Sequence, residues 1–291
     1  MNEVKRLCST TYAETFDFFY RESIEEQTRK SKGRPIPEAK LDELEKMAQK
    51  EAIKSATLSA MKAFPETETA EIWKLVYSIH VHRKSGIDDN DTIEKVISAN
   101  QSWIKSSGHA FEEIIKFLGN IALTETGIEI ILQRDLSTLI KENKLDNEPR
   151  DISWLKEQIR GNIFDLYVIV SKGGKNYCFG CIQSKTSIRD RVTRDREPSI
   201  QAMKSFFWSI CLVLDGDFLK NGKFISMVNG GTTEHPENGW HGLYVFSEKY
   251  TKDRIYPTDY DMKNLKEHAI KAADYWLTQR QWFDLNWRAD N

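Results

Sequence analysis

The stretch that decides the fold covers residues 163–197 and reads IFDLYVIV (163–170), SKGGKN (171–176), YCFGCIQSK (177–185) and TSIRDRVTRDRE (186–197). Two apolar runs are joined by a Gly-Gly turn, a pattern typical of a β-hairpin. Asp165 interrupts the first run, and Lys185 ends the second. An acid and a lysine on neighbouring strands are unfavourable in an apolar core. Their pairing therefore favours a site that holds a divalent metal beside a phosphate.

The composition favours a globular protein without a general affinity for polyanions. The chain has 291 residues, of which 40% are hydrophobic, enough for one large domain or two unequal ones. Its formal net charge of −2 means that a DNA-binding face must be local, and five basic residues gather between positions 185 and 196. There is no apolar run of about 18 residues, no signal peptide and no disulfide framework among the four cysteines, so we expect a cytoplasmic protein without a membrane span.

Hydrophobic periodicity divides the chain into a helical first part and a mixed second part. Residues 1–105 predict an all-helical accessory domain that embraces DNA or mediates oligomerisation. Residues 106–291 predict an α/β domain with a mixed sheet, because segments with the periodicity of strands alternate with segments that have the periodicity of helices. Its expected helices cover residues 108–123, capped by Ser107, then 126–141, 152–159, 198–214 with Pro198 as first residue, and 261–281. Strands are expected on both sides of the Gly-Gly turn and at 224–228 and 243–246.

The acid and the lysine of the hairpin are the first candidates for chemistry. Hydrolysing a phosphodiester needs a metal that polarises the phosphoryl oxygen, and Mg²⁺ needs only a few protein carboxylates. Asp165 could supply one, and Lys185 could act on the attacking water or hold the phosphate; the alternatives are a solvent-facing strand acid and an ordinary exposed lysine. Gln183 shares the strand face of Lys185 because side chains alternate with period two. An amide offers a metal only a neutral oxygen, so a second carboxylate must come from elsewhere.

Two segments can provide that second carboxylate. Glu197 lies twelve positions beyond Lys185, just before the helix expected at residue 198; the alternative is an acid that serves the helix dipole. Glu112 lies at the border of an apolar helical stripe, whereas Glu113 should point further out to water. The alternative for this pair is two solvated glutamates.

Arginines and aspartates between the lysine and Glu197 are the candidates for base recognition. Arginine can donate two hydrogen bonds to guanine O6 and N7, and aspartate can accept one from cytosine N4. Arg189-Asp190-Arg191 thus has the groups to read neighbouring G and C edges, and Arg194 and Arg196 repeat the pattern. The sequence leaves open which copy reads bases. The alternative is a salt-bridged, solvated loop, the usual fate of a charge run.

Cysteines and aromatics elsewhere favour structural roles. Cys178 and Cys181 are three residues apart, which should place their thiols on opposite faces of a strand, and no second CxxC follows. We therefore expect buried small residues rather than zinc ligands. The aromatics near the end of the chain, Trp276, Phe283 and Trp287, should lie in the core or at a subunit interface. The chain lacks GxxxxGK[ST], so nothing indicates use of a nucleoside triphosphate.

Taken in order, these motifs resemble a known group of nucleases. A helical glutamate (GHAFEE, 108–113), a strand aspartate (IFDLYV), a lysine ending the next strand (IQSK), an RDR segment and a further glutamate are similar to the PD-(D/E)XK nucleases. They resemble more closely the type II restriction endonucleases that recognise CCGG-centred palindromes, of the BsaWI type. The resemblance covers residues 106–246, and it departs at Phe164, where the pattern has proline, and at Gln183, where this group more often has serine or cysteine.

The resemblance implies a restriction-endonuclease-like mixed β-sheet core flanked by helices, with residues 106–291 as the PD-(D/E)XK catalytic domain. In this group a glutamate on the following helix replaces the acid that usually precedes the lysine. Asp165 and Glu197 would bind Mg²⁺, Glu112 would assist through the metal's water shell, and Lys185 would orient or activate water. The C:G pairs would be read by Arg189, Asp190 and Arg191.

These expectations describe an Mg²⁺-dependent enzyme that cuts both strands of a CCGG palindrome flanked by A or T and leaves 5′-phosphates. A palindrome requires two-fold symmetry, so at least a homodimer is expected. The expected setting is a prokaryotic restriction-modification system with a cognate DNA methyltransferase. Two alternatives remain open: a structure-specific repair or recombination nuclease of the same fold, and a binding-only DNA regulator. Whether one or two metals bind is also open.

Overall fold

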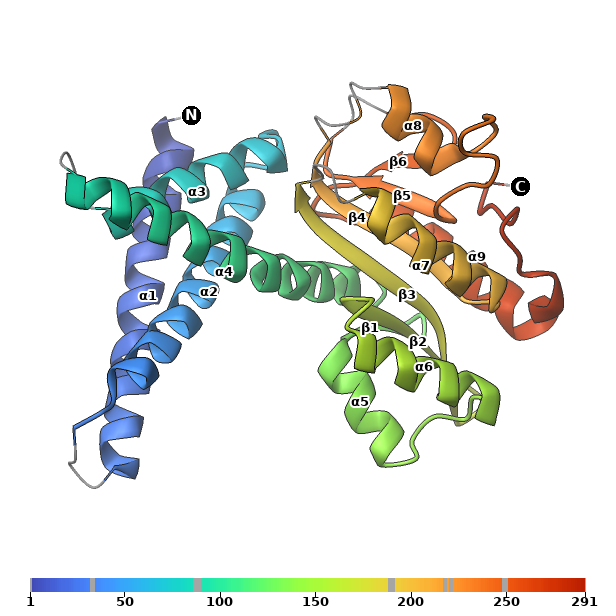
Figure 1. The fold of residues 1–291 in the computed structure, drawn as a ribbon, viewed down its shortest axis with the longest axis horizontal. Coiled ribbons are helices and arrows are strands. Elements are labelled where there is room, and N and C mark those ends of the chain that lie inside the picture. The colour runs from blue at the N-terminus through green and yellow to red at the C-terminus, as the bar shows by residue number, and fades with distance from the viewer. Residues whose placement is uncertain are drawn as a thin grey trace. The chain divides into compact units, whose positions relative to one another are not determined.

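The computed structural model describes residues 2–31, 35–85, 90–187, 192–216, 219, 222–247 and 251–290. Its architecture follows from the hairpin of residues 166–187 (Figure 1). Strands β2 (Leu166–Lys172) and β3 (Lys175–Ser187) pair antiparallel, as the two apolar runs predict. Gly173 and Gly174 make the turn at φ +61° and +77°, a region that favours glycine. The predicted hairpin is confirmed.

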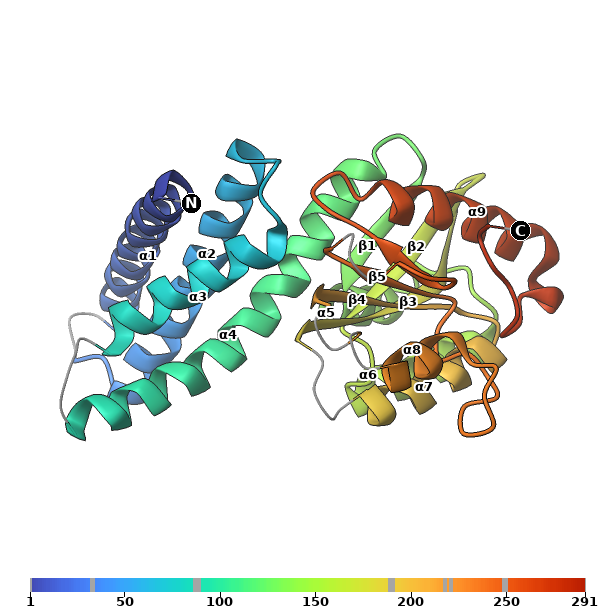
Figure 2. The same cartoon turned by 90° about the horizontal axis from the view of Figure 1, so that it is seen from above.

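The hairpin lies within one six-stranded mixed sheet of order β1-β2-β3-β4-β5-β6. Strand β1 (Ile128–Leu132) is antiparallel to β2, whereas β4 (Trp208–Asp215), β5 (Gly242–Val245) and β6 (Ile255–Pro257) continue from β3 in parallel. Helices α5 (Gln133–Lys141), α6 (Pro149–Gly161), α7 (Val192–Lys204) and α8 (Gly222–Asn229) cover one face; α9 (Lys263–Gln279) covers the other (Figure 2). The predicted fold class, a mixed sheet flanked by helices after a helical N-terminal part, is confirmed.

A β-bulge in the central hairpin changes which residues share a face. Cys181 is paired with Tyr167, but the register shifts between Val168 and Ile169, and Cys178 is paired with Ile169. Cys178 and Cys181 consequently lie in the same apolar cluster, so the prediction of opposite faces is wrong. A bulge inserts one residue and thereby reverses the alternation. Both cysteines are fully buried, and burial raises the pKa of both thiols, as expected of structural cysteines.

One predicted element is wrong and two are wrong in one half, and each error falls on a short apolar segment. The first half of the helix expected at 126–141 is strand β1, and the strand expected at 224–228 belongs to α8. The helix expected at 198–214 ends at Lys204, and Ile210 and Leu214 lie on β4. Strand β4 is buried along its apolar length, and periodicity cannot distinguish such a run from a buried helix.

The helical first part contains α1 (Asn2–Lys30), α2 (Glu38–Ala63), α3 (Thr69–Ser85) and the beginning of α4 (Asn90–Ala122). Its core includes a pair of indole rings, Trp73 and Trp103, with centroids 5.2 Å apart. The Tyr12 hydroxyl and Nδ1 of His80 share a buried hydrogen bond of 2.7 Å. Burial lowers the pKa of His80 to about 4, so its ring is neutral at neutral pH. None of the described helices could span a bilayer.

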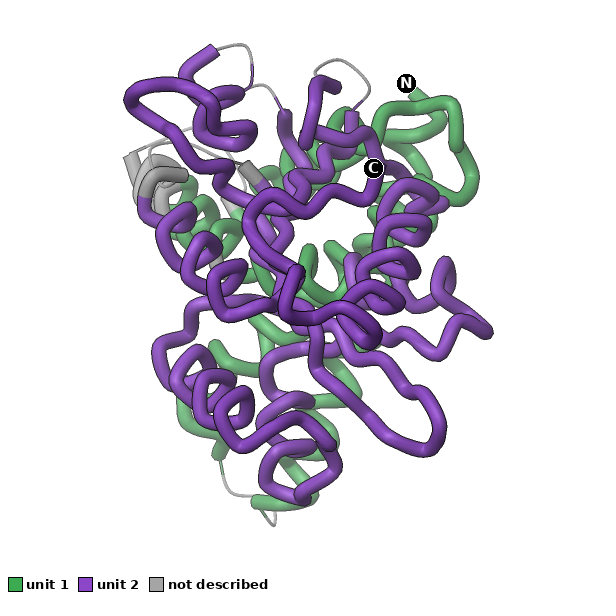
Figure 3. The backbone as a smooth tube through the Cα atoms, turned by 90° about the vertical axis from the view of Figure 1, so that its right-hand side faces the viewer, with its two compact units in different colours: residues 1–114 green, residues 115–291 purple. Residues whose placement is uncertain are grey.

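Helix α4 runs without interruption where the sequence predicted a new helix. Ser107 is buried in the middle of α4, so its prediction as an N-cap is wrong. The apolar helical face continues on both sides of it, through Ala99, Trp103 and Ala110, which keeps the helix intact. The chain divides into two compact units, residues 1–114 and 115–291 (Figure 3).

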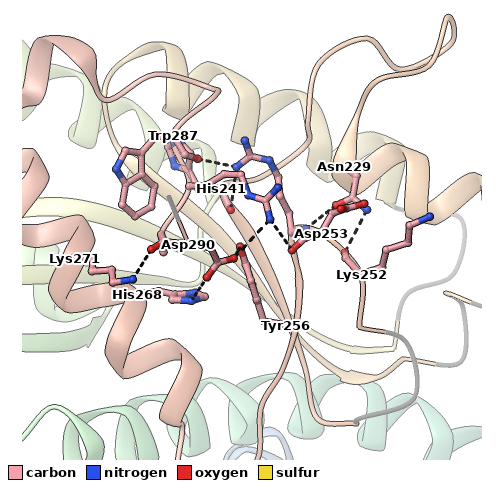
Figure 4. A network of polar contacts seen from close by, with 12 residues as sticks. Asn229, His241, Lys252, Asp253, Tyr256, His268, Lys271, Trp287 and Asp290 are labelled. Atoms are coloured by element: carbon pink, nitrogen blue, oxygen red, sulfur yellow. Dashed lines mark hydrogen bonds and ion pairs between the residues drawn. The ribbon is translucent and has the colours of Figure 1, made fainter.

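The C-terminal tail is tied to the β5–β6 edge of the sheet by a polar network (Figure 4). The buried Arg254 donates to the carbonyl oxygens of Asn286 at 3.0 Å and Trp287 at 2.7 Å. The Asp290 carboxylate accepts from the Tyr256 hydroxyl at 2.8 Å and lies 3.2 Å from Nε2 of His268. We call these contacts the C-terminal clasp. Phe283 is buried in this region and packs against the partly buried Trp287, with ring centroids 4.8 Å apart.

Candidate active site

Asp165 is held between three elements directly before β2, rather than within it. Its backbone N–H donates to the carbonyl of Ile182 at 3.0 Å, and its carbonyl accepts from the N–H of Gln133 at 3.3 Å. Its carboxylate Oδ2 accepts two hydrogen bonds from Ser184, 2.6 Å from the backbone nitrogen and 3.2 Å from the hydroxyl oxygen. These bonds fix the direction of the carboxylate.

Two carboxylates converge on the lysine that follows. Nζ of Lys185 lies 3.9 Å from Oδ2 of Asp165 and 3.5 Å from Oδ2 of Asp195, and each of the three side chains is about a quarter exposed. Burial by itself would lower the pKa of the Lys185 ammonium, but the charges of Asp165 and Asp195 outweigh burial and raise that pKa above its ordinary value of 10.5. The hairpin thus brings Asp165 and Lys185 together as predicted, and a second acid joins them.

The second acid comes from a helix start that sequence reasoning misplaced. Helix α7 begins at Val192, so Pro198 lies inside it, and the prediction of Pro198 as the first helical residue is wrong. Asp195 thereby falls in the first turn, where an acid is favoured by the helix dipole. The sequence signal that could have identified Asp195 is its angular position on the helix. Residues 195 and 197 lie about 200° apart on one helix, so only one of them can face the lysine.

Glu197 lies on the exposed part of α7. Its Oε1 accepts a hydrogen bond of 2.8 Å from Nε2 of Gln201, one turn further along the helix. The residue that meets Lys185 is Asp195. The role of Glu197 as metal ligand stays a prediction, and the contacts give Asp195 the better position for it.

The helical glutamates lie in the first compact unit, residues 1–114. The carboxylate of Glu112 lies 3.4 Å from Nδ1 of His109, and its side chain is 20% exposed. Glu113 is paired with Nζ of Lys50 at 2.9 Å and is 16% exposed, so the expectation that it points to water is wrong. This ion pair gives Glu113 a structural partner on α2. The catalytic role of Glu112 stays a prediction.

The predicted recognition residues are only partly described. Arg189, Asp190 and Arg191 lie outside the described residues. Arg194 is exposed at the start of α7. Arg196 donates from Nε to the carbonyl of Met227 at 3.0 Å and from Nη2 to the carbonyl of Glu237. These bonds attach α7 to the end of α8 and the loop behind it, so Arg196 has a structural role.

Gln183 occupies the strand position where an acid would complete a hairpin site. It is 1% exposed. Its Nε2 donates to the main-chain carbonyl of Asp195 at 3.0 Å, and its Oε1 accepts from the indole N–H of Trp240 at 2.8 Å. The Gln183 amide therefore binds the backbone of Asp195 and the indole of Trp240. That a carboxylate from outside the hairpin completes the site stays a prediction.

The donor set fits Mg²⁺. Among the described residues no group of three or more His, Cys, Asp or Glu side chains could hold a metal. Mg²⁺ usually keeps several waters and takes one or two protein carboxylates together with substrate phosphate. Asp165 and Asp195 could supply those two carboxylates, because the Oδ2 atoms of both lie near Nζ of Lys185, at 3.9 and 3.5 Å, and both side chains are partly exposed.

In comparisons with known proteins, the chain is similar to restriction endonucleases. Residues 144–282 match the family model described as BsaWI restriction endonuclease type 2. The solved structure of restriction endonuclease BsaWI in a pre-specific complex with DNA is 55% identical, with a TM-score of 0.68 over 98% of each chain. That of AgeI in a specific DNA complex is similar in fold, with a TM-score of 0.56 over 90% of this chain and 91% of that one, at 17% identity. The type II restriction enzyme AgeI of Thalassovita gelatinovora is 24% identical over 208 residues. The match covers 66% of this chain and 66% of AgeI, which is just under two thirds of the length of AgeI.

Proposed function

We propose, because the chain belongs to the BsaWI restriction endonuclease family, that it hydrolyses both strands of double-stranded DNA at a short palindrome containing CCGG, with Mg²⁺ as cofactor. The observation that carries the proposal is the convergence of Asp165 and Asp195 on Lys185 at the end of β3. A partly exposed pair of acids beside a lysine suits phosphodiester hydrolysis, because the carboxylates could bind a metal and the ammonium could bind the phosphate.

Each side chain has a distinct part in the proposed reaction. Asp165 and Asp195 would hold Mg²⁺, which when bound polarises the phosphoryl oxygen and lowers the pKa of water. The two Ser184 bonds orient the Asp165 carboxylate. Lys185 carries three N–H donors and no acceptor when protonated. It would therefore hold the scissile phosphate and the attacking water in line. Attack at phosphorus expels the 3′ oxygen and leaves a 5′-phosphate.

Recognition is proposed for the segment that joins two members of this site. Arg189, Asp190 and Arg191 follow Lys185 and precede Asp195 in the chain. Base readout would thus be connected at both ends to catalytic residues. Because the site is palindromic, two copies of the chain are needed, and at least a homodimer is proposed. Glu112 would assist through the metal's water shell.

The test is digestion of a plasmid with Mg²⁺, followed by sequencing of the ends. Discrete fragments that all end at one CCGG-containing palindrome, with 5′-phosphates, are expected. Asp165→Ala should abolish cleavage and keep measurable specific binding. A smear, or cutting at branched structures, would indicate a structure-specific nuclease, and retention of DNA without products would indicate a regulator. A DNA methyltransferase gene beside this one would be independent support.

A further inference from the structure

We infer that Gln183 is a positioning residue for Asp195. Its amide joins the indole N–H of Trp240 to the main-chain carbonyl of Asp195, and so fixes the first turn of α7 with the Asp195 carboxylate facing Lys185. The inference rests on the proposed function and deepens it, because it assigns a role to the one residue of β3 that departs from an acidic metal-binding pattern.

The orientation of the amide follows from its partners. An indole N–H can only donate, so the atom of Gln183 that meets Trp240 must be the carbonyl oxygen. The amide nitrogen then has to face the Asp195 carbonyl, which can only accept. Gln183 and Trp240 are each 1% exposed, so the bond between them is shielded from water, and the bond from Gln183 to the Asp195 carbonyl is partly buried. A buried amide with both ends satisfied is costly to misplace, which makes the contact rigid.

The first turn of α7 needs an external support. Pro198 lies inside the helix. Proline has no N–H to offer the carbonyl of residue 194, and its ring crowds that carbonyl. The first turn of α7 therefore lacks the helical hydrogen bond to the carbonyl of residue 194. Gln183 supports this turn from β3 through the Asp195 carbonyl.

The indole is itself held in place by a tight loop after α8. The carbonyl of Trp240 accepts from Nδ2 of Asn238 at 2.9 Å. A Cβ on Gly239 would lie 2.6 Å from the carbonyl oxygen of Met227 and 3.2 Å from Cγ of Arg196. The backbone therefore approaches α8 so closely that only glycine fits there. The indole N–H of Trp240 is thus a fixed donor that holds the Gln183 amide in place. The amide in turn holds the main-chain carbonyl of Asp195.

An acid at position 183 could not take this role. A glutamate could accept from the Trp240 indole, but its second oxygen would face the Asp195 carbonyl oxygen without a proton between them. A buried charge and an unpaired carbonyl both oppose that arrangement. Methionine has nearly the volume of glutamine and lacks the hydrogen-bonding groups, so Gln183→Met removes the two bonds with little change in packing.

The test measures metal binding without turnover. Calorimetric titration of Ca²⁺ into the enzyme–DNA complex should show about 10–100-fold weaker binding for Gln183→Met, the usual effect of losing a group that orients a metal ligand. Trp240→Phe, which removes the indole donor together with part of the ring volume, should weaken Ca²⁺ binding in the same direction by a smaller factor. Trp276→Phe is the matched control, because its indole N–H donates to the carbonyl of Phe206 at 2.8 Å in a comparably buried setting. That control should keep wild-type Ca²⁺ affinity.

Coupling to Asp195 separates positioning from general loss of structure. In an Asp195→Ala background, Gln183→Met should weaken Ca²⁺ binding no further, because the group it positions is gone. Independent, additive losses would overturn the inference, and so would equal losses in Trp240→Phe and Trp276→Phe. If Gln183→Met does not fold, Trp240→Phe carries the same comparison. Failure of the proposed function would look different, since the wild-type protein itself would then show no Mg²⁺-dependent cleavage.

Discussion

Replacing Asp195 by alanine should greatly reduce the cleavage rate and change the stability of the protein only a little. Its Oδ2 lies 3.5 Å from Nζ of Lys185, while Asp165 stays 3.9 Å from the same nitrogen. Removing Asp195 takes away one attraction but also the repulsion between two carboxylates, so the free energy of unfolding should change by about 1 kcal/mol or less. The cleavage rate should fall about 10²–10³-fold, as when a preorganised charged group is lost from a transition state.

Glu197→Ala is the matched control, two residues along the same helix. It removes one exposed hydrogen bond to Gln201, worth about 0.5 kcal/mol or less. If Asp195 rather than Glu197 holds the metal, the cleavage rate should stay within about twofold of wild type. The assay is single-turnover cleavage of a duplex with one palindrome at saturating enzyme over a range of Mg²⁺, with thermal unfolding measured in parallel. An active Asp195→Ala beside an inactive Glu197→Ala would refute the reasoning and assign the metal to Glu197.

Three further perturbations test recognition, protonation and the tail. Arg191→Ala should cost about 1–3 kcal/mol of discrimination at one base pair in competition binding; equal weakening for all sequences would instead make it a phosphate contact. Burial holds the pKa of His80 at about 4 and of His241 at about 3, below the unfolded value of 6.5. The unfolded chain then binds more protons below pH 6.5. The free energy of unfolding should fall as pH drops from 6.5 towards 4, by up to about 1.4 kcal/mol per pH unit for each histidine, and a flat pH profile of thermal melting would contradict this. Arg254→Met should free residues 284–290 from the C-terminal clasp, because it leaves their carbonyls unpaired, and limited proteolysis should then cut the tail first; unchanged resistance would contradict that role.

The contacts of Asp195 and Glu197 show that the local sequence pattern did not predict where α7 begins. Pro198 is a good first helical residue by composition alone, which points to Glu197 as the acid before a helix. The helix instead begins at Val192, and its first turn is supported by Gln183 and Arg196, whose partners lie on other elements. Those partners are distant in sequence, so no window around residue 197 contains the information.

The sequence by itself determined the central hairpin and the local acid–lysine pair, and it predicted the need for a further carboxylate. These depend on alternation, on the Gly173-Gly174 turn and on the chemistry of an amide at position 183, all of which are local. Only the tertiary structure decided that residues 208–215 form a strand and that Asp195 meets Lys185. A strand buried along its length has no periodic signature, and a helix start that depends on long-range hydrogen bonds cannot be seen in its own residues.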